Sequence, residues 1–319
     1  MPDSYDVVII GSGPAGLSAG IYAGRAGLNS LMIEKDKGGL IASTFAVENY
    51  PGATENISGA MLSERMRQQA LSSGCQIMLG EATSIEKKPN GYFETTLVET
   101  TLASNKKVLQ SISVIAATGT TPRLLGVPGE LEYRGRGVSY CATCDAFFFR
   151  GKEVVVIGGG DSALQEARYL AKIASKVTIV HRRDEFRATK AEVNATRAIG
   201  DKIGFLLNCI PVEIYGSSIV QGVKVQNTQT GEFVDVACDG VFIYAGLVPQ
   251  NSIFRGLVDL DDGGYIVAGE NTHTSLEGMF AAGDARTTLL RQVVTACADG
   301  AISALQAMAY INEFVKSNS

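Results

Sequence analysis

Two copies of one glycine-bearing segment limit what this chain can fold into. The first copy, residues 5–35, reads YDVVIIGSGPAGLSAGIYAGRAGLNSLMIEK, and the second, residues 152–183, reads KEVVVIGGGDSALQEARYLAKIASKVTIVHRR. Each copy has a continuous apolar run, a G-x-G-x-x-G/A motif, a helical stretch and a second apolar run. Such continuous apolar runs are typical of parallel strands buried on both faces. The repeat therefore predicts two β-α-β units in one chain.

The glycine motifs predict where phosphates bind. In such a unit the first glycine permits a tight turn, and the second lets the backbone approach a pyrophosphate. The third position packs the helix on the strand, with the phosphates at the helix N-terminus. The motif residues are Gly11, Gly13 and Gly16 in the first copy, and Gly158, Gly160, Asp161, Ser162 and Ala163 in the second.

The end of the second apolar run distinguishes the two copies. Glu34 and His181 occupy equivalent positions, each 23 residues after the first glycine of its motif. Glu34 can accept hydrogen bonds from a free ribose diol and would repel a 2′-phosphate. The second copy instead offers a cationic surface for a 2′-phosphate, formed by Arg182, Arg183 and Arg187, and His181 joins them as a predicted NADPH-site residue. We therefore expect the first copy to bind FAD and the second to bind NADPH.

The last part of the chain is expected to complete the first unit. Gly283 and Asp284 follow an apolar run at residues 278–282, and Arg291 and Gln292 lead into a long helical stretch rich in small residues. An aspartate placed there can hydrogen-bond the ribityl or pyrophosphate region of FAD, and the helix N-terminus can stabilise charge on reduced flavin. The second copy would then be inserted within the first domain.

The predicted fold is α/β, with two Rossmann-like, three-layer β/β/α nucleotide-binding domains. The NADPH-binding domain is expected at residues 120–244, inserted between the two parts of the FAD-binding domain, at 1–119 and 245–319. The junctions at 117–122 and 244–249 are short, carry Gly and Pro, and have the character of hinges.

Composition excludes several classes of protein. With 319 residues, 45% of them hydrophobic and 19% charged, the chain is long enough for two domains with cores of their own. A net charge of −5 argues against a nucleic-acid binder. No run of about 18 apolar residues predicts a membrane span, and the N-terminal MPDSYDVVII does not resemble a signal peptide. We expect a cytoplasmic protein.

The order of the motifs resembles that of the bacterial and archaeal low-molecular-weight thioredoxin reductases. The motifs are GSGPAG, VENYPG at 47–52, ATG at 117–119, CATCD at 141–145, GGGDSA, HRRDEFR and GD…RQ, and they extend over essentially the whole chain. The resemblance implies an FAD site, whose residues here are Gly11, Gly13, Gly16, Glu34, Gly39, Leu40, Asn49, Gly119, Gly283, Asp284, Arg291, Gln292 and Val293. Leu40 departs from the glutamine that many relatives have, so flavin contacts there must come from the backbone.

The Cys141-x-x-Cys144 pair can be read as a metal clip, a structural crosslink or a redox-active disulfide. A zinc site needs a second pair of ligands, and His181 and His273 are the only histidines, so no metal is expected. Structural disulfides are rare in the cytosol. Cysteines at i and i+3 share one helix face, and a helix start favours the thiolate. The residues favour the redox disulfide.

The resemblance also implies roles for the residues of this segment. Cys144 would face the flavin, Cys141 would attack the partner's disulfide, and Asp145 would give and take the proton of the dithiol. Arg136, Phe147 and Phe148 would dock thioredoxin. The resemblance further implies a homodimer, and we expect the NADPH-binding domain to rotate so that Cys144 and Cys141 can react with their separate partners.

The predicted function is therefore thioredoxin-disulfide reduction with FAD and NADPH. Some relatives instead take electrons from ferredoxin, generally with an eroded second motif, whereas GGGDSA and the arginines are intact here. The alternatives are a ferredoxin-dependent thioredoxin reductase, a flavin dithiol oxidase that uses oxygen, and a non-catalytic redox sensor that binds both nucleotides.

Overall fold

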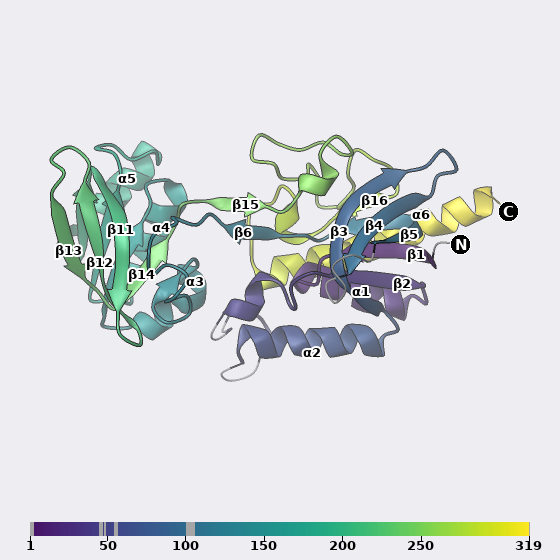
Figure 1. Ribbon diagram of the computed structural model, residues 1–319, viewed down its shortest axis with the longest axis horizontal. Helices are drawn as coiled ribbons and strands as arrows, with labels where there is room; N and C mark the ends of the chain where they lie inside the picture. Colours follow the sequence, from purple (N-terminus) through teal and green to yellow (C-terminus); the bar gives the residue numbers. More distant parts are fainter. Residues whose placement is uncertain (1–2, 45–46, 48, 54–56, 100–105, 319) are drawn as a thin grey trace. The chain divides into compact units, whose positions relative to one another are not determined.

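The computed structural model describes residues 3–44, 47, 49–53, 57–99 and 106–318 (Figure 1). The described residues form two compact units, the first within 1–43, 47–121 and 248–319 and the second within 122–247, to which residue 44 also belongs. Two strands, β6 (Thr120–Pro122) and β15 (Leu247–Pro249), pair with each other where the chain crosses between the units. The predicted insertion of one nucleotide-binding fold into the other is confirmed.

The first unit is built on a sheet of five parallel neighbours in the order β3-β2-β1-β5-β16. Its strands are β1 (Asp3–Ile10), β2 (Ser30–Glu34), β3 (Gln76–Lys87), β5 (Lys106–Ala116) and β16 (Met279–Ala281). The long strands β3 and β5 continue beyond the parallel sheet and pair antiparallel with β4 (Phe93–Glu99). These parts form the two β layers of the predicted architecture.

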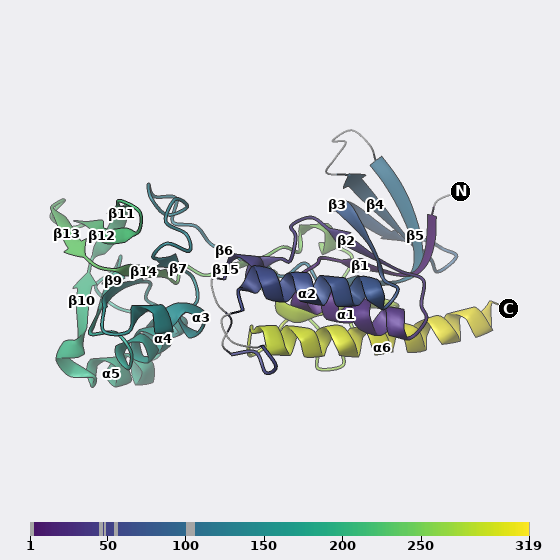
Figure 2. The same ribbon diagram turned by 90° about the horizontal axis from the view of Figure 1, so that it is seen from below.

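Three helices form the third layer of the first unit: α1 (Pro14–Arg25), α2 (Gly59–Ser72) and α6 (Val293–Ser317). All three lie on the same side of the parallel sheet (Figure 2). Short 3-10 helices lie at Leu40–Ser43, Ser252–Phe254 and Gly283–Ala285. The last of them follows β16 directly and carries Asp284.

The second unit repeats this plan. Its parallel sheet has the order β10-β9-β8-β14-β7, with strands β7 (Val138–Ser139), β8 (Glu153–Ile157), β9 (Lys176–His181), β10 (Ile203–Leu207) and β14 (Gly240–Ile243). An antiparallel sheet contains β11 (Cys209–Gly216), β12 (Val220–Asn227) and β13 (Phe233–Ala237). The helices are α3 (Ala142–Asp145), α4 (Asp161–Ala171) and α5 (Lys190–Arg197), with 3-10 turns at Ala146–Phe149 and Gly200–Lys202.

The first strand of each copy has the same alternation of side chains. In β1, Val7 and Ile9 pack against the helices, whereas Val8 and Ile10 pack against the antiparallel layer. In β8, Val154 and Val156 pack on the side of the helices. Val155 and Ile157 pack on the side of the antiparallel sheet. A strand between two apolar layers needs apolar residues at consecutive positions, which explains the continuous runs VVII and VVVI.

Helix α6 alone, among the helices that the structure describes, has the length and apolar composition of a membrane span. Polar residues, among them Asp299, Ser303 and Gln306, interrupt this helix, so it contains no continuous run of about 18 apolar residues. Within the first unit, Ala304 and Ala307 of α6 are buried. At Gly300, a Cβ atom would come 2.1 Å from the carbonyl oxygen of Ala15, so α6 packs closely on α1. The small residues of α6 therefore serve helix packing.

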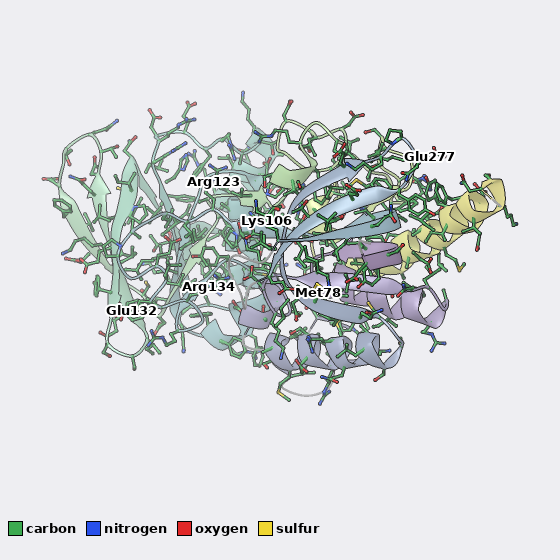
Figure 3. The ribbon with its side chains drawn as sticks, turned by 45° about the vertical axis from the view of Figure 1, so that its right-hand side comes forward. Met78, Lys106, Arg123, Glu132, Arg134 and Glu277 are labelled. Atoms are coloured by element: carbon green, nitrogen blue, oxygen red, sulfur yellow. A yellow bond between two sulfur atoms is a disulfide. The ribbon has the colours of Figure 1, made fainter. Side chains whose placement is uncertain are left out.

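A buried carboxyl group organises the segment before the CxxC motif. Glu130 accepts hydrogen bonds from the backbone N–H groups of Leu125 and Gly126, at 3.0 and 2.8 Å, and from the hydroxyl of Tyr140 at 3.0 Å. The guanidinium of Arg134, labelled in Figure 3, lies 5.5 Å from the centroid of the Tyr140 ring. These contacts fix the residue immediately before Cys141.

Candidate active site

The first glycine turn lies between β1 and α1. A Cβ atom on Gly11, whose φ is +111°, would come 2.3 Å from the carbonyl oxygen of Ala117, and one on Gly16 would come 1.9 Å from that of Gly11. A Cβ atom on Gly13 would meet no atom of the described residues within 4 Å. Gly11 and Gly16 are therefore required by packing, whereas Gly13 borders open space at the N-terminus of α1. This arrangement fits a bound pyrophosphate.

Alanine substitutions should separate these two roles. Gly16→Ala is expected to destabilise the protein by about 1–3 kcal/mol or more, because the methyl group collides with backbone. Gly13→Ala is expected to leave the melting temperature unchanged while weakening FAD binding about tenfold or more, because the methyl group enters the phosphate site. Melting curves of the FAD-free proteins and FAD titrations measure the two effects. Equal FAD affinity for Gly13→Ala and wild type would contradict this assignment.

The predicted ribose ligand Glu34 is the last residue of β2. Its side chain is 1% exposed, and its carboxylate oxygens accept from Nε of Arg67, on α2, at 3.2 and 3.4 Å. Sequence patterns gave no sign of Arg67, since it lies 33 residues away on a different element. A carboxylate has acceptor sites beyond those that one N–H uses, so this contact leaves Glu34 able to accept a ribose hydroxyl.

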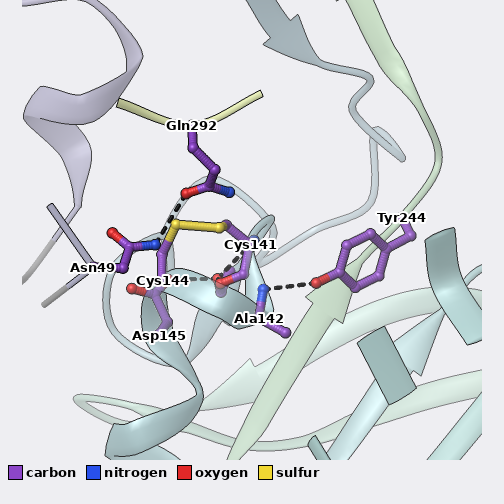
Figure 4. Close-up of a disulfide and its surroundings, with 8 residues drawn as sticks. Asn49, Cys141, Ala142, Cys144, Asp145, Tyr244 and Gln292 are labelled. Atoms are coloured by element: carbon purple, nitrogen blue, oxygen red, sulfur yellow. Dashed lines mark hydrogen bonds between the residues drawn. A yellow bond between two sulfur atoms is a disulfide. The ribbon is translucent and has the colours of Figure 1, made fainter. Parts of the chain in front are cut away.

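Several other predicted FAD residues are brought together within the first unit. A Cβ atom on Gly39 would come 2.9 Å from the Cα of Gly13, so the loop that leads to Leu40 lies against the glycine turn. The Nδ2 of Asn49 donates to Oε1 of Gln292 at 3.0 Å (Figure 4). Gln292 is the N-cap of α6, Val293 begins that helix, and Gly119 has a φ of +65°.

The segment after β16 is held by a buried ion pair. The carboxylate of Asp299, on α6, accepts from Nε and Nη2 of Arg286, each at 2.7 Å, and from the backbone N–H of Gly283 at 3.0 Å. Asp299 and Arg286 were not among the predicted site residues. They fix the turn that carries Asp284, the residue predicted to contact FAD.

Polar groups beside this turn fit a ligand. Burial raises the pKa of Asp284 to about 6, although the charge of Arg291 acts in the opposite direction. The Arg291 guanidinium lies 4.2 Å from the centroid of the Tyr265 ring. Its Nε is buried and has no hydrogen-bond partner among the described residues. A bound dinucleotide would supply an acceptor to such a donor.

The second glycine turn has the same design. A Cβ atom on Gly158 would come 2.8 Å from that of Ala163, so this glycine meets the third motif position directly. A Cβ atom on Gly160 would come 3.3 Å from its nearest neighbour, the Nη2 of Arg187. That atom is the end of a flexible side chain, so it could move aside. The α4 N-terminus behind Gly160, with Asp161 and Ser162 exposed in its first turn, is open to a phosphate group.

The arginine loop is attached to this glycine turn through Gly159. The backbone N–H groups of Arg187 and Ala188 donate to the Gly159 carbonyl at 2.8 and 3.2 Å. His181 ends β9, and a Cβ atom on Gly159 would come 2.2 Å from its ring. Burial lowers the pKa of His181, whose Nε2 lies 3.1 Å from the Glu185 carbonyl oxygen. The predicted phosphate turn and cationic loop thus form one surface.

Cys141 and Cys144 form a disulfide (Figure 4). Cys141 is the N-cap of α3 and Cys144 lies within it, as the spacing predicted. Because α3 has only four residues, its dipole acts more weakly on the thiols than that of a full-length helix would. The hydroxyl of Tyr244, just after β14, accepts from the Ala142 backbone N–H at 2.7 Å and thereby anchors the motif from the sheet.

Asp145 follows the disulfide and is poorly solvated. Its Oδ2 accepts from Oγ of Ser139 at 2.5 Å, and its Oδ1 is buried with no partner among the residues that the structure describes. Burial raises the pKa of the Asp145 carboxyl, while the Ser139 hydrogen bond acts against that shift. A carboxyl with a raised pKa, next to a dithiol, suits proton exchange. The sequence gave no signal for Ser139.

The residues predicted to dock a partner lie in the second unit. Phe147 is 51% exposed, with the guanidinium of Arg150 4.9 Å from its ring centroid, whereas Phe148 is half-buried and Phe149 is buried. Of these three consecutive aromatic residues, Phe147 alone is largely exposed. The exposed Arg136 lies over the Tyr133 ring and donates to the Glu132 carbonyl.

Comparison with known proteins identifies the family of this chain. Residues 5–300 match the model of a family described as pyridine nucleotide-disulphide oxidoreductase. The chain is 46% identical to a thioredoxin reductase of Peptoclostridium acidaminophilum over 98% of both chains. It is 45% identical to one from Bacillus subtilis (strain 168), covering 97% of this chain and 95% of that one. A crystal structure of thioredoxin reductase from Streptococcus pyogenes matches with a TM-score of 0.89 and 40% identity, over 98% of this chain and 100% of that one.

The chain belongs to the pyridine nucleotide-disulphide oxidoreductase family. The predicted resemblance and the predicted fold are therefore confirmed, and the protein is a flavoprotein oxidoreductase with a redox disulfide. FAD and NADPH are the cofactors of this family. The cradle at Gly13 and the unpartnered donor on Arg291 fit the first cofactor, and the joined surface of Gly160 and the arginine loop fits the second.

Proposed function

We propose that this protein is an NADPH-dependent thioredoxin-disulfide reductase. In the first half-reaction, NADPH, one proton and the Cys141–Cys144 disulfide give NADP⁺ and the dithiol. In the second, the dithiol reduces the disulfide of thioredoxin, which takes two electrons and two protons, and the Cys141–Cys144 disulfide forms again. When bound, NADPH supplies the electron pair as hydride and FAD relays the electrons to the disulfide. The chain's own residues bind the nucleotides, hold the disulfide and handle the protons.

One observation carries this proposal. The disulfide is followed directly by a carboxyl group whose pKa is raised by burial, in a unit that has its own dinucleotide turn. A purely structural crosslink needs no such carboxyl group. In the reaction, Cys141 would attack the partner's disulfide, Cys144 would exchange electrons with the flavin, and Asp145 would exchange a proton with the dithiol.

The other predicted assignments are part of the same proposal. Residues 1–119 and 245–319 would form the FAD-binding domain, and 120–244 the NADPH-binding domain, with the two crossings as hinges. The partner would be thioredoxin or a thioredoxin-like protein, docked at Arg136, Phe147 and Phe148. The protein would act as a homodimer in the cytoplasm, with no nucleic acid or membrane partner.

The alternative functions differ in their electron donor or acceptor. The intact glycine turn and the exposed arginines of the second unit favour NADPH over ferredoxin. The test is anaerobic reduction of the flavin by NADPH, NADH and reduced ferredoxin, side by side, followed by addition of oxidised thioredoxin. We expect NADPH to bleach the flavin and thioredoxin to restore its colour with formation of thiols. The proposal would be overturned if reduced ferredoxin bleached the flavin and NADPH did not. It would also be overturned if dithiols drove oxygen consumption and thioredoxin was not reduced.

A further inference from the structure

Ser139 lies between the cysteine motif and Asp145. It is the last residue of the short strand β7, pairs with Phe242 of β14, and is 5% exposed. Its Oγ lies within hydrogen-bond distance of three groups: Oδ2 of Asp145 at 2.5 Å, the backbone nitrogen of Cys141 at 3.1 Å and the Cys141 carbonyl oxygen at 3.3 Å. One hydroxyl therefore contacts both the first cysteine and the carboxyl group that follows the second.

The hydroxyl has one hydrogen, and the distances indicate where it goes. The Cys141 N–H can only donate, so Ser139 Oγ is the acceptor of that bond. Its hydrogen then has two candidate acceptors, and Asp145 Oδ2 is closer by 0.8 Å than the Cys141 carbonyl oxygen. The Cys141 carbonyl also accepts from the backbone N–H groups of Cys144 and Asp145. The hydrogen of Ser139 is thus directed to Asp145 when that carboxyl is ionised.

This arrangement makes the two oxygens of Asp145 unequal. Oδ2 is tied to Ser139, while Oδ1 is buried with no partner among the described residues. A buried carboxylate oxygen without a hydrogen bond is costly, and the cost falls when that oxygen takes up a proton. When Asp145 is protonated, Ser139 can turn its hydrogen to the Cys141 carbonyl, so the hydrogen of Ser139 has an acceptor in either state.

We propose that Ser139 is a positioning residue that fixes Asp145 relative to Cys141 and leaves Oδ1 as the oxygen that exchanges a proton with the dithiol. The proposal rests on the proposed function, in which Asp145 acts as that proton carrier. No proton is consumed by Ser139 itself: the proton that Oδ1 gives to a thiolate is regained when the dithiol is oxidised by its partner's disulfide.

Asp145 has another ionisable group close to it. Tyr244, after β14, feels the charge of Asp145 and also that of Glu166 on α4. Cys141 and Cys144 themselves become ionisable when the disulfide is reduced. The effect of Ser139 must therefore be separated from these groups by a signal that belongs to Asp145 alone.

The test uses two variants of equal shape, Ser139→Thr, which keeps a hydroxyl, and Ser139→Val, which lacks one, together with Ser139→Ala. Protonation of Asp145 is followed against pH in the FAD-loaded protein as the infrared C=O band of a carboxylic acid that disappears in Asp145→Asn. Because the lost hydrogen bond stabilised the ionised form, the band should persist to higher pH in Ser139→Val and Ser139→Ala. In Ser139→Thr it should titrate as in wild type.

Turnover with NADPH and thioredoxin is measured in parallel. We expect a loss of about tenfold or more in Ser139→Val and partial or full retention in Ser139→Thr, as for a hydrogen bond to a charged group. Ser113→Ala, which removes a buried hydroxyl bonded to the Gly278 carbonyl at 2.9 Å, controls for loss of a buried hydroxyl elsewhere.

The outcomes distinguish this proposal from the proposed function. If the Asp145 carboxyl titrated at the same pH in Ser139→Val, Ser139→Thr and wild type, the proposed role of Ser139 would be refuted, whatever the turnover. A shifted titration in a protein whose wild type fails to reduce thioredoxin would support Ser139 and refute the proposed function.

Discussion

Replacing either Cys141 or Cys144 by serine is expected to abolish NADPH-dependent reduction of thioredoxin, by at least about a thousandfold. A hydroxyl group cannot form the disulfide that accepts and passes on the electron pair. The two cysteines are bonded to each other, so loss of one leaves a single thiol. The measurement is the rate of thioredoxin thiol formation, with the remaining free thiols counted by alkylation.

FAD binding should survive both substitutions, because the glycine turn that fits FAD belongs to the first unit, whereas the two cysteines belong to the second. Cys209→Ala is the matched control, since Cys209 is also in the second unit but is a free, buried thiol. It should keep nearly full activity. Turnover at the wild-type rate in Cys141→Ser or Cys144→Ser would refute the redox role of the pair.

Replacing both Arg182 and Arg183 by alanine is expected to weaken NADPH binding about a hundredfold or more while changing NADH binding little. Each arginine can make a charge-assisted hydrogen bond with the 2′-phosphate, which NADH lacks. Both side chains are exposed, and the loop that carries them is held against the second glycine turn by the Gly159 carbonyl. Affinities for both nucleotides, at two salt concentrations, test this expectation, since exposed charges are screened by salt.

Arg197→Ala is the control for this double substitution, because Arg197 is an exposed arginine on α5 of the same unit. It should leave both affinities unchanged. If the double variant lost NADPH and NADH equally, the arginines would serve the fold of the loop and not recognition of the phosphate.

The sequence determined the fold of this protein through local patterns. Consecutive apolar residues at 7–10 and 154–157 could be read as strands buried on both faces because burial between two layers leaves no position for a polar side chain. The glycine motifs were equally readable, since a Cβ atom at Gly11 or Gly16 collides with backbone of the same β-α-β unit or of the neighbouring strand. The spacing of Cys141 and Cys144, together with the lack of a second pair of metal ligands, favoured the bond that the structure shows.

The tertiary structure alone decided the polar partners of these residues. Arg67 reaches Glu34 from α2, Asp299 holds Arg286 from α6, and Ser139 holds Asp145 from β7. Such pairs have no fixed spacing, because a side chain selects its partner by direction and distance after the layers have packed. Burial then makes each pair obligatory, since a polar group removed from water must be bonded inside the protein. For this reason the sequence predicted the cysteines, and only the fold revealed the hydroxyl group that orients the carboxyl group beside them.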